Sequence, residues 1–112
     1  MKKAVWLSYD LSLNGDYMGL YKWLDKNEAK ECGDGVAFFK FDFSSARGND
    51  AEEKKKLLSS IKTNVKINVG RDRMYAVWER SDGKIKGRFL VGNRKRAPWE
   101  GAAGQTSEED DD

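Results

Sequence analysis

The fold is decided by two neighbouring stretches, Lys3-Ala-Val-Trp-Leu-Ser-Tyr-Asp10 and, after a short turn, Gly15-Asp16-Tyr17-Met-Gly-Leu20-Tyr21-Lys-Trp-Leu24. Alternate residues of the first stretch point to opposite faces, and both faces carry apolar side chains, which predicts a central strand covered at least partly on both sides. In the second stretch apolar residues recur at i, i+3, i+4 and i+7, which predicts a helix over 16–30. The strand ends on Asp10, where a small α/β domain would hold a metal ion or face a phosphate.

The remaining pattern adds strands and one more helix. A strand is predicted over 36–43, and a weak strand over 29–33 would pair with it as a hairpin through Asp34-Gly35. A second helix begins at Asn49 or Asp50, where a capping side chain precedes an apolar stripe. Strands over 73–80 and 84–91 are joined by a turn at Ser81-Asp82-Gly83.

This order predicts an α+β fold, a ferredoxin-like βαββαβ sandwich with an extra C-terminal strand. The helices would cover one face of an antiparallel sheet, and the domain would span 1–92. Residues 93–112 would form a basic segment followed by a flexible acidic tail. The uncovered face would carry Trp6, Phe38 and either Tyr75 with Val77 or Met74 with Trp78. Because that face is too apolar for a monomer surface, we expect a homodimer packed sheet to sheet.

The amino-acid composition limits the kinds of catalysis that the chain could perform. The 112 residues make one domain, which holds thirteen aromatic residues, a single cysteine (Cys32) and no histidine. A lone cysteine forms no internal disulfide, so a reducing, cytoplasmic setting is expected. The lack of histidine excludes Ser-His and Cys-His catalysis and nearly every zinc site. Any catalysis would therefore rest on carboxylates, with a hard cation such as Mg²⁺. No apolar run is long enough to span a bilayer and none resembles a signal peptide, so no membrane partner is expected.

The charge is unevenly distributed. The net charge is +2, but residues 108–112 are all acidic, and the rest of the chain carries +7. Residues 66–99 hold ten Lys and Arg against three acids. A concentrated basic surface favours polyanions through counterion release, so RNA or DNA is a candidate partner. The alternative is a basic face that is merely solvated.

A family resemblance joins these features. Ser8-Tyr9-Asp10-Leu11, Gly15-Asp16-Tyr17, Leu20-Tyr21 with Leu24, and the later Asp72-Arg73-Met74-Tyr75-Ala76-Val77 resemble the CRISPR-associated protein 2 superfamily, especially its small stand-alone relatives. The resemblance covers roughly residues 3–80. The chain differs from those relatives in Gly33-Asp34-Gly35-Val36, where they have a serine-aromatic pair, and in a longer and more basic 84–99 segment.

The resemblance implies a ferredoxin-like homodimer in which the fifth strand often reaches across to the partner. Some members are metal-dependent ribonucleases or deoxyribonucleases, and others are non-catalytic scaffolds that grip nucleic acid. The related virulence-associated protein D toxins are ribonucleases of this fold. In the nuclease members a strand-end aspartate is the metal ligand, and the matching position here is Asp10. Two copies would then supply two carboxylates to one Mg²⁺.

The candidate site follows from these points. Asp10 is the candidate catalytic and metal-binding residue, and the alternative is that it caps the following turn. Asp16 is interpreted as a helix-start acid rather than a ligand. Trp78 and Trp99 would either stack on bases or pack in the core or an interface. The candidate nucleic-acid-binding residues are Arg71, Arg73, Arg80, Lys84, Lys86, Arg88, Arg94, Lys95 and Arg96.

Three functions remain open at this point. The first is a nucleic-acid-binding homodimer that acts as a Mg²⁺-dependent endonuclease through Asp10. The second is a non-catalytic scaffold or adaptor of the same fold that binds nucleic acid or a protein. The third is a regulatory module whose acidic C-terminal tail docks on a basic protein partner.

Overall fold

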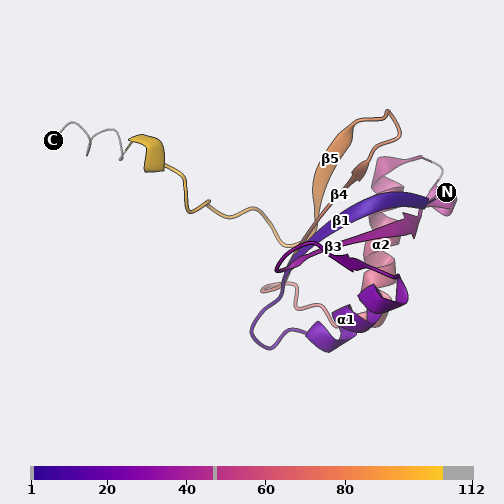
Figure 1. Ribbon diagram of the computed structural model, residues 1–112, viewed down its shortest axis with the longest axis horizontal. Coiled ribbons are helices and arrows are strands. Elements are labelled where there is room, and N and C mark those ends of the chain that lie inside the picture. The colour runs from indigo at the N-terminus through magenta and orange to yellow at the C-terminus, as the bar shows by residue number, and fades with distance from the viewer. Residues whose placement is uncertain (1, 47, 105–112) are drawn as a thin grey trace.

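The computed structural model describes residues 2–46 and 48–104 (Figure 1). These residues form an α+β fold with one five-stranded sheet in the order β2-β3-β1-β4-β5, and every neighbouring pair of strands is antiparallel. Of the predicted acidic tail over 101–112, residues 105–112 lie outside the described residues. The elements are β1 Lys2–Asp10, α1 Tyr17–Lys26, β2 Lys30–Glu31, β3 Val36–Asp42, the short 3₁₀ helix η1 Ser44–Ala46, α2 Asp50–Asn64, β4 Arg73–Glu79 and β5 Ile85–Val91.

Both α-helices pack against the same face of the sheet, which we call the helix face; the other is the open face. Leu20 of α1 and Ile61 of α2 are fully buried together with Val5 and Leu7 of β1. Burying these side chains removes apolar surface from water and supplies most of the driving force for folding. Within the described residues, no helix combines the length and apolarity needed to cross a membrane.

Strand register decides which side chains lie on the open face. Trp6 of β1 stands opposite Phe38 of β3 and Val77 of β4. Tyr75 is opposite Ser8, so Tyr75 and Val77 face the open side, whereas Met74 and Trp78 are fully buried under the helices. The first of the two alternatives for this face is therefore confirmed.

The first helix ends earlier than the sequence pattern predicts. It stops at Lys26 instead of residue 30, because Glu28 adopts a left-handed backbone with φ of 55°. The N–H of Ala29 donates to the carbonyl of Leu24, which closes the helix and turns the chain into β2. The predicted weak strand over 29–33 is reduced to the two residues of β2, which pair with Phe38 and Ala37 of β3.

One acid is completely buried in the core. Glu53 of α2 has 0% exposure and accepts a hydrogen bond from the indole N–H of Trp78 at 3.2 Å. Its other carboxylate oxygen lies 2.8 Å from the ammonium of Lys3, which also donates to the carbonyl of Glu79 at 3.0 Å. This set of contacts ties α2 to β1 and to β4. A buried charge of this kind is tolerated only with such partners.

We predict that Glu53→Ala destabilises the fold by about 3–5 kcal/mol, because it leaves the ammonium of Lys3 and the indole N–H of Trp78 without their partner. Urea unfolding followed by circular dichroism measures this difference. The control is Glu52→Ala, an exposed acid in the same helical turn, which we expect to cost less than about 1 kcal/mol. Equal effects of the two substitutions would contradict the prediction.

Candidate nucleic-acid interface

Asp10 lies at the end of β1, where the strand leaves the sheet. Its partner in the β1–β4 register is Arg73, whose guanidinium is 3.8 Å from the carboxylate of Asp10. The side chain of Asp10 is 70% exposed, and an ion pair this open to water is weak. The carboxylate is therefore accessible to other charged groups.

The turn after β1 is held by a different carboxylate. Within the described residues no backbone N–H donates to Asp10, so the turn-capping alternative is not supported there. Instead, Asp72 accepts the N–H of Ser12 at 2.7 Å and the N–H of Asn68 at 2.8 Å. Asp72 is 1% exposed, and it joins the loop after β1 to the loop before β4.

The pKa of Asp72 reflects two opposed effects. Burial acts to raise it, and the hydrogen bonds from the N–H groups of Ser12 and Asn68 lower it by more. The result is a pKa below the ordinary value of 3.8. Asp72 is therefore a charged, fully engaged residue that positions the surroundings of Asp10. No local sequence signal indicates this role of Asp72, because one of its two partners, Ser12, lies 60 residues away in the chain.

Asp16 behaves as the predicted helix-start acid. Its carboxylate accepts the N–H of Gly19 in the first turn of α1 and the N–H of Lys66 beyond the end of α2, both at 2.9 Å. The N–H of Lys66 and then that of Gly19 lower the pKa of Asp16. This residue joins the two helices and is not directed at the site near Asp10.

Asp10 lines a cavity of about 270 Å³ at the edge of the open face. The rings of Tyr75 and Phe89 lie in it with their centroids 4.8 Å apart. The guanidinium of Arg94 lies 5.5 Å from the Phe89 ring and 6.0 Å from the Tyr75 ring. The cavity thus combines one carboxylate, two guanidinium groups and two aromatic rings.

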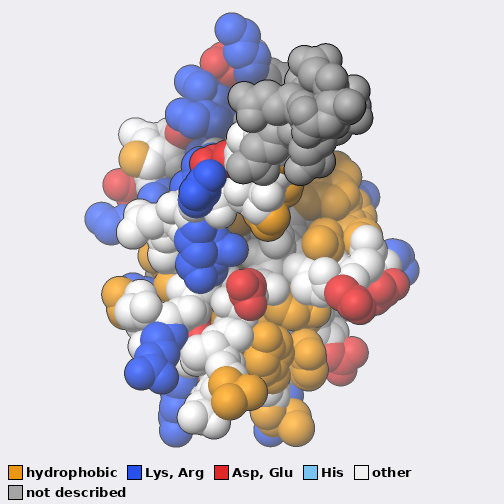
Figure 2. All heavy atoms as spheres, turned by 90° about the vertical axis from the view of Figure 1, so that its left-hand side faces the viewer, with side chains coloured by type: hydrophobic (Ala, Val, Ile, Leu, Met, Phe, Trp, Pro, Cys, Tyr) orange, Lys and Arg blue, Asp and Glu red, His pale blue; other side chains and the backbone are white. Residues whose placement is uncertain are grey.

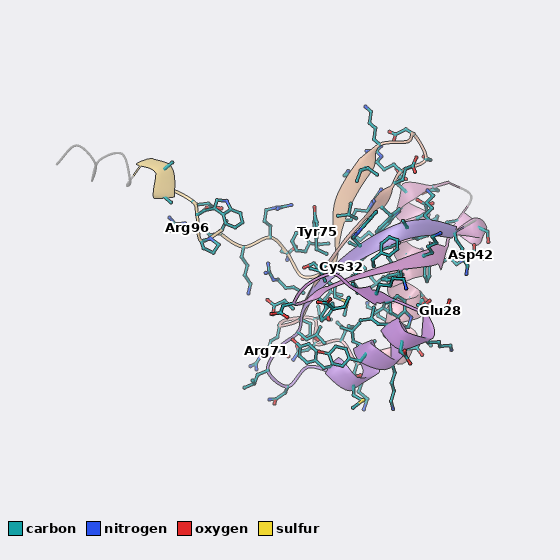
Figure 3. All side chains as sticks on the ribbon, viewed as in Figure 1. Glu28, Cys32, Asp42, Arg71, Tyr75 and Arg96 are labelled. Carbon is teal, nitrogen blue, oxygen red and sulfur yellow. The ribbon has the colours of Figure 1, made fainter. Side chains whose placement is uncertain are left out.

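A second, adjoining hollow of about 540 Å³ is mainly basic. Arg71, Arg73, Arg94 and Lys95 all line it, and we call these four residues the basic end. The acid in this lining is Asp72, whose oxygens are already occupied by backbone N–H groups. Figure 2, which faces this end of the molecule, shows Lys and Arg side chains gathered in a band beside apolar ones. Arg71 and Tyr75 lie at this end, and Arg96 lies farther along the C-terminal segment (Figure 3).

The other predicted binding residues lie elsewhere. Arg80 is at the tip of the β4–β5 hairpin, 3.1 Å from Asp50 and 3.4 Å from Asp82. Lys84 and Lys86 are exposed near the same tip. The nine predicted residues therefore form no single surface.

Arg88 is on the opposite side of the sheet from the open face. Its partner in the register is the buried Ala76, so its side chain points to the helix face. There it is 9% exposed, and its guanidinium lies 4.2 Å from the ring of Trp78 and 3.7 Å from Asp50. Trp78 itself is fully buried, so of its two predicted roles the core one is confirmed.

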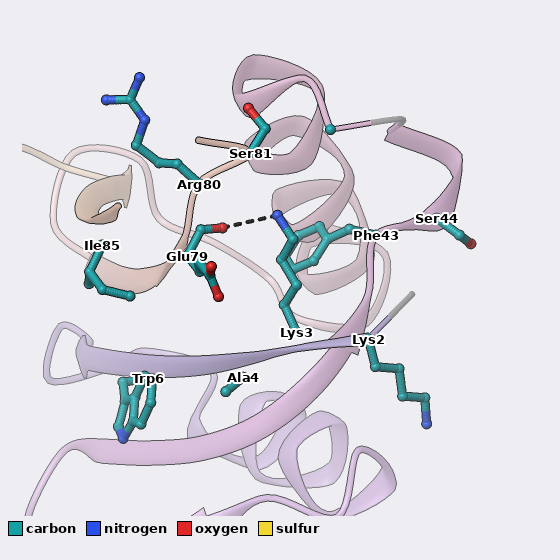
Figure 4. Close-up of a pocket in the computed structure, with 11 residues that line it drawn as sticks. Lys2, Lys3, Ala4, Trp6, Phe43, Ser44, Glu79, Arg80, Ser81 and Ile85 are labelled. Atoms are coloured by element: carbon teal, nitrogen blue, oxygen red, sulfur yellow. Dashed lines mark hydrogen bonds between the residues drawn. The ribbon is translucent and has the colours of Figure 1, made fainter. Parts of the chain in front are cut away.

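A larger hollow of about 810 Å³ opens at the far end of the molecule, beside the first residues of β1 (Figure 4). Its cations are largely engaged: Lys3 binds Glu53 and the carbonyl of Glu79, and Arg80 pairs with Asp50. No sequence motif predicts this hollow, because the residues that line it come from distant segments of the chain. We therefore place the candidate site at the Asp10 end.

The described residues contain no group of three or more Cys, Asp or Glu that could hold a metal ion. Asp10 alone offers a single carboxylate with a guanidinium beside it. One chain therefore does not fit a Mg²⁺ site, because this ion needs more oxygen ligands than Asp10 provides.

Comparison with protein-family models, curated proteins and solved structures found no match.

We predict that Asp72→Asn destabilises the fold by about 1–3 kcal/mol at pH 7, because one of the two backbone N–H groups loses its acceptor. Since folding lowers the pKa of Asp72, its contribution is complete above the ordinary pKa of 3.8 and is lost as the pH falls through the folded pKa. The difference between wild type and variant should therefore shrink below pH 4 or so.

Urea unfolding at neutral and acidic pH measures this difference. The control is Asp34→Asn, an exposed acid in the β2–β3 turn, for which we expect a change within about 0.5 kcal/mol. A difference between wild type and Asp72→Asn that stays constant with pH would be the contrary result.

Proposed function

We propose that the protein is a nucleic-acid-binding homodimer with a ferredoxin-like fold, and that paired Asp10 residues make it a Mg²⁺-dependent endonuclease. The observation that carries the proposal is the position of Asp10, which lies between the basic end and the apolar open face. The resemblance to the CRISPR-associated protein 2 superfamily supports the same function.

The strand order supports the ferredoxin-like part of the proposal. That fold consists of two βαβ units. The two strands of one unit are not neighbours in the sheet, because a strand of the second unit lies between them. Here β3 lies between β1 and β2, and β1 lies between β3 and β4. β5 extends the sheet beyond β4, as the extra C-terminal strand of the prediction would.

The open face supports the homodimer. Trp6 is 44% exposed and packs on Phe38 with ring centroids 5.0 Å apart, and Ile85 is 63% exposed. A second copy applied to this face by a two-fold axis would bury the same patch on both chains. An axis near the end of β1 would also bring the two Asp10 carboxylates together. Mg²⁺ held there would activate water and neutralise charge developing on a phosphodiester.

The basic end supports binding to phosphates. Arg71 and Lys95 are exposed and form no ion pair within the described part of the chain. Cations without partners bind phosphates and release counterions, whereas Arg80 would first have to leave its acids. Lys84 and Lys86 near the hairpin tip are also exposed and form no ion pair within the described residues, so the basic end is favoured mainly by its position beside Asp10.

A specific observation also favours the non-catalytic alternative. The guanidinium of Arg73 is 3.8 Å from Asp10 and already neutralises part of its charge. In a scaffold or adaptor this pair would help to set the position of Arg73 for a phosphate. Binding without cleavage is the behaviour expected of that alternative.

We predict that Asp10→Asn abolishes Mg²⁺- or Mn²⁺-dependent cleavage of labelled single-stranded RNA or duplex DNA, because the metal loses its carboxylate ligands. The control is Asp25→Asn, an exposed acid on α1, which should cleave like wild type. Dimer mass and binding in EDTA should be unchanged in both variants. Cleavage that survives Asp10→Asn would exclude Asp10 as the metal ligand, and binding with no cleavage by wild type would establish the scaffold.

We predict that Trp6→Glu converts the dimer into a monomer, because it places a charge within the apolar interface. Sedimentation at several concentrations measures the mass. Met18→Glu is the matched control, since Met18 is 65% exposed on α1, away from the open face. A wild-type protein that sediments as a monomer would refute the dimer and leave the open face free for another partner.

A further inference from the structure

The chain leaves the body of the protein after β5 as a projecting segment, residues 93–104, which we call the C-terminal arm (Figure 1). It departs at Gly92, whose φ of 81° and close approach to Arg73 suit glycine. The guanidinium of Arg73 donates to the carbonyl of Asn93 at 3.3 Å. Arg94 then packs over the rings of Tyr75 and Phe89. The start of the arm is thus fixed beside Asp10 and the basic end.

The tip of the arm is a locally closed turn. The N–H of Ala97 donates to the carboxylate of Glu100 at 2.9 Å, and the N–H of Glu100 donates to the carbonyl of Ala97 at 3.1 Å. This reciprocal pair resembles a capping box, with Pro98 at the first position of the turn. Arg96 lies 3.6 Å from the same carboxylate. Residues close in sequence therefore set the conformation of the tip.

The turn displays a tryptophan that does not pack on the body. Trp99 is 75% exposed, and no aromatic contact involves it within the described residues. An exposed indole gains nothing for folding, because its apolar surface stays in water. Within the described residues, the tip thus presents a large and mostly exposed aromatic ring on a turn that local hydrogen bonds hold.

The chemistry around Trp99 favours one kind of ligand. Three consecutive cations, Arg94-Lys95-Arg96, precede it, and the acid nearby, Glu100, is occupied by Ala97 and Arg96. The large apolar side chain of the arm is Trp99 alone, its other apolar residues being alanine and proline, and cations precede it. Cations that track a backbone, together with a ring that stacks on bases, are the features by which proteins hold single strands.

We infer that Trp99 is a base-stacking residue, and that the C-terminal arm holds an unpaired nucleotide of a strand whose phosphates lie on Arg94-Lys95-Arg96 and the basic end. The ligand class is single-stranded RNA or DNA. The base pairs inside a duplex stack on each other and offer no free face to the indole, so a duplex presents such a face only at its two ends. This inference rests on the proposed nucleic-acid binding and is independent of whether Asp10 supports cleavage.

The test is fluorescence anisotropy on the full-length protein in EDTA, with labelled single strands of about 12 nucleotides and the matching blunt duplex, at several salt concentrations. Trp99→Ala should weaken binding of the single strands by about 5- to 150-fold, and leave both the duplex affinity and the salt slope unchanged. Trp99→Phe should recover most of the loss. Tryptophan quenching by the single strands should diminish in Trp99→Phe.

Two further variants distinguish the contribution of base stacking to binding from that of electrostatic attraction. Lys95→Ala should weaken single strands and duplex alike and reduce the salt slope by about one. Met18→Ala, which removes an exposed apolar side chain elsewhere, should bind like wild type.

Three outcomes would overturn the inference. If wild type binds and Trp99→Ala binds equally well, Trp99 does not stack, and the proposed nucleic-acid binding stands. If wild type binds neither probe, both the inference and the proposed function fail. If Trp99→Ala weakens both probes equally and sediments as a monomer, Trp99 serves the contact between two copies.

Discussion

The rest of the structure depends on the pairing of β1 with strands on both sides. β3 and β4 fix its register, so each residue of β1 is committed to one face. Val5 and Leu7 lie beneath the helices, Trp6 lies on the open face, and Asp10 ends the strand beside Arg73. A shift of one residue would exchange the two faces. The register of β1 with β3 and β4 thus determines which residues form the core, the open face and the candidate site.

Much of the fold could be predicted because its signals are local. The alternation in β1 and the apolar stripe of α2 are visible within a few residues, and both elements form as predicted. Features that depend on distant partners could not be predicted. Glu53 resembles an ordinary first-turn acid, and its burial depends on Lys3 and Trp78, which lie far away in the sequence. The end of α1 was missed because the left-handed backbone at Glu28 has no strong sequence signal.

The candidate site was also predictable only in part, because some of its features depend on residues that are distant in the sequence. The strand pattern located Asp10, whereas the face occupied by Arg88 follows from its pairing with Ala76 of the neighbouring strand β4. The arm and the basic end meet because Gly92 turns the chain beside Arg73. The amino-acid composition does not distinguish basic residues that pair with acids of the fold from those that are exposed.

That difference in surroundings is the strongest argument about partners. Lys3, Arg80 and Arg88 are engaged by acids of the fold itself, namely Glu53, Asp50 and Asp82. Drawing such a cation away to bind a phosphate would leave its acid without a counter-charge, which is most costly for the fully buried Glu53. The cations of the basic end and the start of the arm lie next to one another and to Asp10. One end of the sheet therefore brings basic side chains together with the Asp10 carboxylate, and the arm that carries the exposed Trp99 starts there.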